Sequence, residues 1–290
     1  MNVISVGGGK GGTGKSTIAV NVAILLSKAG YRVLLVDADV ESPIDHIMLG
    51  LERKKQKSVT AFSPKINAEK CIRCGVCIEK CPEHALIGLT NRVPILLKDL
   101  CEGCKLCFFV CPVGAIEDEG RNIGAIYEGE NYGIKLIQGE VFSGIKQHVN
   151  VSLATIRYAE KFFEGYEFIV IDSPPGTGAG VWLPLIRSNI AIAVTEPTPL
   201  GASDLKRYLY LTNKAKLRTI TVLNKADIPG GAKKIIYKIA EEFNSSIIEV
   251  PYDPLLMNAY VNEKPAVIMY PDSEGVKALM KLSELLINEL

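Results

Sequence analysis

The sequence lacks any long hydrophobic run. None of its apolar stretches approaches the ~20 residues that a helix needs to span a bilayer, so membrane insertion is not expected. The first residues lead directly into a short apolar segment and a glycine-rich loop, unlike a signal or transit peptide. Together these absences predict a cytoplasmic protein.

An excess of charge of one sign is also missing. The chain has 33 Lys and Arg against 32 Asp and Glu, a formal net charge of +1, and contains no long basic run. This balance gives no reason to expect a nucleic-acid partner. Hydrophobic residues make up 48% of the 290 residues, so a well-packed core is feasible. At roughly 100–200 residues per domain, the length predicts one or two domains.

Cysteine is absent from most of the chain. All eight cysteines lie between Cys71 and Cys111. A disulfide framework would spread its pairs through a small secreted chain, whereas this chain has no export signal. The clustering therefore favours reduced thiols that ligate metal.

Short apolar runs alternate with amphipathic stretches in the rest of the sequence. Apolar strands separated by helices indicate an α/β fold with a mostly parallel sheet that is covered on both faces. The first helix is expected at residues 15–29. The strands are expected at residues 3–6, 32–36, 168–171, 190–194, 219–223 and 247–250.

One segment, residues 59–120, breaks this alternation. It is rich in cysteine and proline, and its two halves repeat each other, beginning at Cys71 and Cys101. We expect it to be a small α+β domain inserted after the second strand. The main domain would then consist of residues 1–58 and 121–290.

A phosphate-binding loop is predicted directly after the first strand. Its residues fit the pattern G-x-x-x-x-G-K-[ST] and open a predicted helix, which is the context that this motif requires. Lys15 would reach the β- and γ-phosphates and Ser16 would ligate Mg²⁺. The alternative is a glycine-rich turn that binds nothing. The expected nucleotide-binding residues here are Gly9, Lys10, Gly11, Gly12, Thr13, Gly14, Lys15, Ser16 and Thr17.

Each half of the cysteine-rich segment has the spacing C-x₂-C-x₂-C-x₃-C-P. This is the run of bacterial ferredoxins with two [4Fe–4S] clusters, in which the fourth cysteine ligates the other cluster. Structural zinc is the alternative, but a duplicated run of this kind is not a zinc spacing. The first cluster is assigned to Cys71, Cys74, Cys77 and Cys111, and the second to Cys81, Cys101, Cys104 and Cys107.

Polar residues follow several of the predicted strands. Asp37, Asp39 and Asp172 come at the carboxyl ends of strands, where ligands bind in open α/β sheets. Each aspartate could instead only cap a following helix or turn. Asn224 opens the sequence Asn-Lys-Ala-Asp, which matches the N-K-x-D pattern by which many GTPases read guanine. GTP therefore remains open beside ATP.

These motifs resemble one family, the MinD-superfamily P-loop ATPases that contain an inserted ferredoxin domain. The loop G-K-G-G-T-G-K-S, with its early lysine, resembles the deviant Walker A motif of the MinD, ParA and nitrogenase-iron-protein ATPases. The resemblance extends to residues 37–43 (DADVESP), 172–177 (DSPPGT), 195–199 (TEPTP) and 250–254 (VPYDP).

The resemblance implies a role for several residues. Lys10 would cross the interface of a nucleotide-dependent homodimer, and Asp39 would orient or activate the attacking water. Asp37 and Asp172 would hold the hydration shell of Mg²⁺ together with Ser16. Asn224 would contact adenine, and the backbone near Pro251 and Asp253 would support the base from its other side.

The leading functional hypothesis is a Mg²⁺-dependent ATPase that couples its nucleotide state to electron transfer with an unknown redox partner. A second hypothesis is an ATPase that assembles clusters or delivers them to an acceptor protein. The C-x-x-C of the Mrp-type carriers is missing, because no cysteine follows Cys111. A third is a positioning ATPase of the ParA and MinD type with structural clusters.

Overall fold

Nine strands form the main sheet of the computed structural model, which describes residues 1–89 and 91–289. Neighbouring strands from β13 to β9 are parallel, and β8 runs antiparallel to both of its neighbours. In spatial order the strands are β13 (Ser246–Val250), β12 (Arg218–Asn224), β11 (Ile190–Thr195), β1 (Asn2–Gly7), β10 (Phe168–Asp172), β2 (Val33–Asp37), β9 (Ile134–Val141), β8 (Arg121–Asn131) and β3 (Lys54–Ala61).

The central strands are buried along their whole length. Every residue of β2, β10 and β11 is buried, because helices cover both faces of the sheet. This arrangement confirms the prediction of a mostly parallel α/β fold. The six predicted strands agree with β1, β2, β10, β11, β12 and β13 to within a residue or two at each end.

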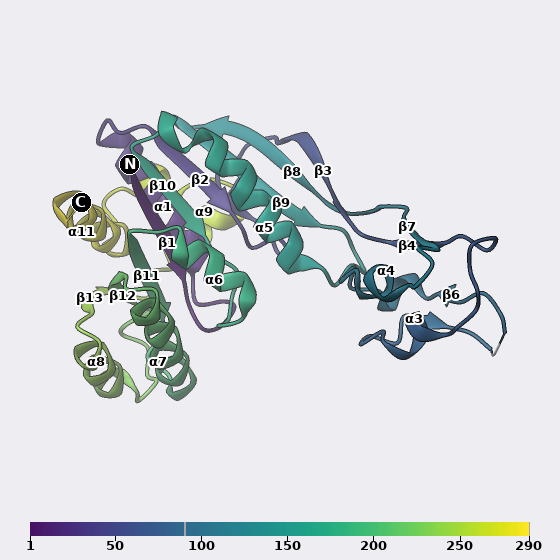
Figure 1. Ribbon diagram of the computed structural model, residues 1–290. Helices are drawn as coiled ribbons and strands as arrows, with labels where there is room; N and C mark the ends of the chain where they lie inside the picture. Colours follow the sequence, from purple (N-terminus) through teal and green to yellow (C-terminus); the bar gives the residue numbers. More distant parts are fainter. Residues whose placement is uncertain (90, 290) are drawn as a thin grey trace.

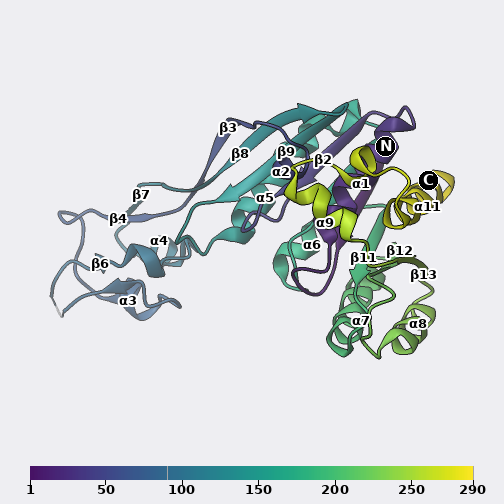
Figure 2. The same ribbon diagram turned by 180° about the vertical axis from the view of Figure 1, so that it is seen from behind.

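Two layers of helices enclose the sheet (Figure 1). Helix α11 buries Leu279, Leu282 and Leu286 against the sheet and α1. One layer, nearer the viewer in Figure 2, consists of α1 (Lys15–Lys28), α2 (Asp45–Met48), α9 (Pro254–Val261), α10 (Ala266–Met269) and α11 (Glu274–Glu289). The other consists of α5 (His148–Ala159), η2 (Glu160–Gly165), α6 (Ala179–Ile186), α7 (Pro199–Lys214) and α8 (Lys233–Glu242). Within the described part of the chain, no helix is both long and apolar enough to cross a bilayer.

Strands β3, β8 and β9 extend the sheet beyond what the sequence predicted. β3 and β8 form an antiparallel ribbon that leads away from the sheet to the cysteine-rich part (Figure 1). Val59 pairs with Gly124 in this ribbon and is buried in the core beneath α5. Residues 59–61, which the sequence assigned to the insertion, are thus the end of a strand of the main sheet.

The cysteine module, residues 62–120, lies at the far end of the ribbon (Figure 1). Its buried core is small and consists of Phe62, Leu86, Cys107 and Ile116. Its elements are β4 (Pro64–Ile66) paired with β7 (Ile116–Asp118), β5 (Leu86–Ile87) paired with β6 (Ile95–Leu96), α3 (Val76–Glu79), α4 (Leu106–Val110) and η1 (Lys98–Leu100).

The sequence repeat of the module is also a conformational repeat. Arg73 and Gly103 occupy equivalent positions and have φ of 59° and 69°. Gly75 and Lys105 are likewise equivalent, with φ of 76° and 65°. A non-glycine residue in this left-handed region is strained. Each half therefore contains one strained position where the other half has glycine, which holds both cysteine loops in the same turn.

Candidate functional site

The glycine-rich loop joins β1 to α1 at the carboxyl edge of the sheet. Gly14 has a φ of 95° and directly precedes the first residue of α1. A Cβ at Gly14 would lie 2.4 Å from the Asn224 side-chain nitrogen, and one at Gly9 would lie 2.2 Å from the Cβ of Asp204. Only glycine permits such a turn and such close packing.

Both lysines of the loop have partners within the chain. Lys15 is 5% exposed, and its Nζ donates to the carbonyl of Lys10 at 3.2 Å. The Nζ of Lys10 lies 3.4 Å from one carboxylate oxygen of Glu196, while the Nζ of Lys225 lies 2.6 Å from the other. Glu196 therefore offsets two positive charges beside the loop.

Two predicted aspartates meet at the ends of adjacent strands. Asp37 ends β2 and Asp172 ends β10, and the two residues are paired in the parallel register. Each is 1% exposed. The Ser16 hydroxyl, in the first turn of α1, is close enough to the Asp172 carboxyl to lower its pKa, so the start of α1 lies at this edge.

A third carboxylate, which the sequence did not indicate, joins this pair. Asp45 is the first residue of α2 and is fully buried. Carboxylate oxygens of Asp37, Asp45 and Asp172 lie within 4.8 Å of one another. A lone aspartate at the start of a four-residue helix carries no signal of such a contact, because α2 reaches the site only through the fold.

Burial governs the protonation of these groups. It raises the pKa of Asp172 to about 7, against the opposing effects of the Ser16 hydroxyl and Lys15. Burial also raises the pKa of Asp39 to about 6, although Lys15 lowers it. Burial, and then the neighbouring carboxylates, raise the pKa of Asp37 and of Asp45 well above the usual range. Without a cation, this edge of the sheet retains protons.

The segments expected around the base lie together on the other side of the loop. The Asn224 amide donates to the carbonyl of Thr13 at 2.8 Å, so Asn224 contacts the phosphate loop. The backbone N–H of Tyr252 donates to Asp227 at 2.6 Å, which joins the two segments. Asp253, which follows Tyr252, caps α9 and also accepts a hydrogen bond from the N–H of Gly275 at 2.9 Å. Pro251 lies in the same connection between β13 and α9.

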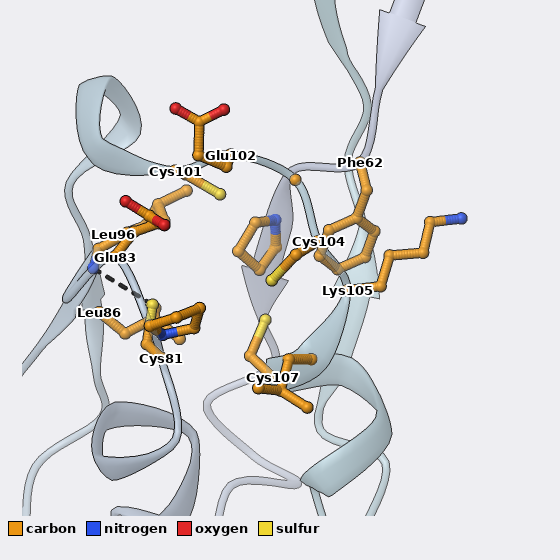
Figure 3. Close-up of a pocket in the computed structure, with 15 residues that line it drawn as sticks. Phe62, Cys81, Glu83, Leu86, Leu96, Cys101, Glu102, Cys104, Lys105 and Cys107 are labelled. Atoms are coloured by element: carbon orange, nitrogen blue, oxygen red, sulfur yellow. Dashed lines mark hydrogen bonds between the residues drawn. The ribbon is translucent and has the colours of Figure 1, made fainter. Parts of the chain in front are cut away.

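The eight cysteines, all among the described residues, are free thiols and form two groups of four. In Figure 3, three thiols of the second cysteine run and one of the first face one hollow. Backbone N–H groups of Ala85 and Ala115 donate to the sulfurs of Cys81 and Cys111 at 3.3 and 3.2 Å. One hollow is lined by Cys81, Cys101, Cys104 and Cys107, and the other by Cys71, Cys74, Cys77 and Cys111.

The cysteine module contacts the main domain beside the Asp39 segment. Gln147, which is 5% exposed, donates from Nε2 to the carbonyl oxygen of Cys101 at 2.7 Å. The next residue, His148, has its Nδ1 3.7 Å from a carboxylate oxygen of Glu41. No pattern in the sequence indicates this contact, which depends on how the ribbon directs the module toward α5.

The sheet order, the phosphate loop and the paired aspartates define a P-loop nucleotide-binding protein. The chain belongs to the CobQ/CobB/MinD/ParA nucleotide-binding domain family, whose model matches residues 4–266. It is 31% identical over 261 residues to an uncharacterized protein of Methanocaldococcus jannaschii, covering 90% of this chain and 89% of that protein.

Other relatives have descriptive names. The chain is 28% identical over 306 residues to an iron-sulfur cluster carrier protein of Pyrococcus abyssi, covering 99% of this chain and 86% of that protein. Among solved structures, it is similar to the cell division ATPase MinD of Pyrococcus furiosus, with a TM-score of 0.62 and 20% identity over 99% of this chain and 98% of that chain. At this identity the structural match shows the shared fold.

Proposed function

We propose that this protein is a Mg²⁺-dependent ATPase that carries two [4Fe–4S] clusters and couples its nucleotide state to electron transfer. The observation that supports ATP hydrolysis is the convergence of Lys15, Ser16, Asp37 and Asp172 beneath the phosphate loop, next to Asp39. Mg²⁺ at this site would neutralise charge that develops on the phosphates.

The residues of the loop have separate tasks in this proposal. Loop N–H groups from Gly9 to Thr17 bind the phosphates, and Lys15 places its charge beside them. Ser16, Asp37 and Asp172 would hold the cation, since hydroxyl and carboxylate oxygens are the ligands that Mg²⁺ prefers. Asp39, which Lys15 helps to keep ionised, orients the attacking water and accepts its proton.

We assign the base site to Asn224 and to the backbone around Pro251 and Asp253. The contact between Asn224 and Thr13 supports this placement, because it positions the amide next to the end of the phosphate loop. If the protein hydrolysed GTP in preference to ATP, residues 224–227 would instead have the role of recognising guanine.

The test is phosphate release from MgATP by the anaerobically purified protein. We expect Lys15→Ala to abolish hydrolysis while the iron content remains that of wild type, since the two sites are in separate parts of the fold. Lys234→Ala, an exposed lysine on α8, is the matched control and should hydrolyse normally. Full activity in Lys15→Ala would contradict the assignment of this loop.

The two groups of cysteines fit the proposed clusters. Each hollow is lined by three cysteines of one run and the fourth cysteine of the other, which is the exchange typical of ferredoxin-like modules. Backbone N–H donors to Cys81 and Cys111 would stabilise the thiolates. When bound, such clusters supply one-electron transfer, and the module holds them with four thiols each.

The proposed coupling runs through the start of α5. Gln147 holds the backbone of the Cys101 loop, and His148 contacts Glu41, two residues after Asp39. A movement of the Asp39 segment when nucleotide binds would therefore reach one cysteine loop through two adjacent residues. We further propose that nucleotide binding brings two copies of the chain together through Lys10.

Cluster delivery is a second candidate function. Cys74 and Cys104 are exposed, one in each group, and several relatives are named iron-sulfur cluster carrier proteins. Incubation with an apo-ferredoxin separates the two functions. Transfer of iron and sulfide to that acceptor would favour delivery, whereas retained clusters that cycle electrons would favour electron transfer.

A further inference from the structure

Three buried carboxylates in contact pose an electrostatic problem. Asp37, Asp45 and Asp172 are each at most 1% exposed, and their oxygens lie within 4.8 Å of one another. The charged groups that act on Asp45 in the described part of the chain are carboxylates, Asp37, Asp172 and Asp39 among them. Burying ionised carboxylates together is very costly unless protons or a cation neutralise them.

Oxygen atoms without hydrogen-bond partners indicate whether protons or a cation neutralise the site. Neither carboxylate oxygen of Asp45 has a hydrogen-bond partner among the described residues, and one oxygen of Asp172 also lacks one. Buried polar atoms without partners are rare and mark strain or a missing ligand. A proton shared between carboxyl groups would leave most of these lone pairs unsatisfied.

The Asp37 carboxylate, unlike that of Asp45, is held in place by hydrogen bonds within the protein. The Gln138 amide donates to Asp37, and Arg53 in turn donates to the Gln138 carbonyl oxygen at 3.1 Å. Such a chain of contacts fixes the orientation of a ligating carboxylate. The Asp37 oxygens are thus directed by β9, while Asp45 and Asp172 approach from α2 and β10.

We propose that Asp45 is a cation ligand that enables this site to bind a hard divalent cation before nucleotide arrives. Ligand oxygens on opposite sides of such an ion lie roughly 4–5 Å apart, for metal–oxygen distances of about 2.0–2.6 Å. Three carboxylates supply more charge than Mg²⁺ needs when nucleotide phosphates complete its shell. The proposal extends the ATP site proposed above and depends on that site only for its location.

Mn²⁺ titration of the nucleotide-free protein tests the proposal. Free Mn²⁺ is measured by its electron paramagnetic resonance signal, with the protein in metal-stripped buffer and its clusters oxidised. We expect one saturable Mn²⁺ per chain, displaced by Mg²⁺ or Ca²⁺, and an affinity at least about tenfold lower in Asp45→Asn. Asp272→Asn, an exposed carboxylate, is the matched control and should bind as wild type does.

Two results would overturn the proposal. One is the absence of saturable Mn²⁺ binding in nucleotide-free wild type, which would show that protons neutralise the site. The other is wild-type affinity in Asp45→Asn. If that variant does not fold, Asp45→Ser takes its place, and the wild-type titration decides by itself whether the cation binds. Because MgATP hydrolysis is measured separately, failure here is distinguishable from failure of the proposed ATPase function.

Discussion

The carboxyl edge of the main sheet and the cysteine module position their reactive groups in opposite ways. At the edge, Asp37 and Asp172 end fully buried parallel strands, and their positions follow from the register of the sheet. In the module, the cysteines lie on turns and short helices, one of them, Cys107, belongs to a core of only four buried side chains among the described residues, and Cys74 and Cys104 are exposed.

This difference indicates what stabilises the structure of each region. The edge is held by the core of the whole main domain. A module with so small a core depends on what its cysteines bind, as small metal-binding domains do. We therefore expect the two regions to fail independently, and the following predictions test that independence.

The largest expected effect is on hydrolysis. Asp39→Asn should bind MgATP but hydrolyse it about 10²–10⁴-fold more slowly, because the variant loses the carboxylate that accepts a proton from water. Its iron content should match that of wild type. Phosphate release and nucleotide retention after gel filtration provide the measurements, and a wild-type rate would remove Asp39 from the mechanism.

The converse variant is Cys104→Ser. It should lower bound iron from about eight to about four per chain, because one proposed cluster loses a ligand. Limited proteolysis should then cut within residues 62–120 while the main domain stays intact and still binds nucleotide. An unchanged iron content, or unfolding of the whole chain, would contradict the expectation that the two regions fail independently. Lys65→Ala, an exposed residue of the same module that lines neither hollow, is the control.

The next effect in size is expected on dimerisation induced by MgATP. MgATP should dimerise Asp39→Asn, and the added Lys10→Ala change should weaken that dimer, because Lys10 is proposed to leave Glu196 for the partner's nucleotide. Lys225→Ala provides a matched control, since it removes the other lysine of the same carboxylate. Light scattering should show the dimer with Lys225→Ala and mostly monomer with Lys10→Ala.

A smaller effect concerns pH. Asp172 has a folded-state pKa of about 7, above the unfolded value near 3.8, so the folded protein retains a proton that the unfolded chain has released. Stability of the protein without metal and nucleotide should therefore fall as pH rises through 7. Melting temperatures at pH 6 and 8 should differ less in Asp172→Asn. An equal pH dependence in both proteins would reassign the titrating group.

Much of this molecule could be predicted from local patterns. The buried strands appear as apolar runs, and the phosphate loop and cysteine runs have fixed spacings. β3 could not be predicted because its first four residues, Lys54 to Lys57, are exposed on an outer strand of the sheet and three of them are lysines. Asp45, Glu196 and Gln147 were also missed. Their contacts join distant segments, and no spacing in the sequence reports such contacts.

The central claim is that the two regions, although expected to fail independently, communicate. The contact between Gln147 and Cys101 makes this testable by redox titration of the cluster potentials. The titration is done without nucleotide, with ADP, and with ATP bound to Asp39→Asn. A coupling of 1–3 kcal/mol is typical of linked sites. At about 59 mV per tenfold change for one electron, it corresponds to a shift on the order of 40–130 mV.

Gln147→Ala should reduce this shift while leaving both iron content and nucleotide affinity unchanged. The account predicts that at least one cluster potential differs between the nucleotide-free and ATP-bound states, and that the difference shrinks in Gln147→Ala. Potentials that coincide within error in all three nucleotide states would contradict the coupling and leave the cysteine module as a passive attachment to an ATPase.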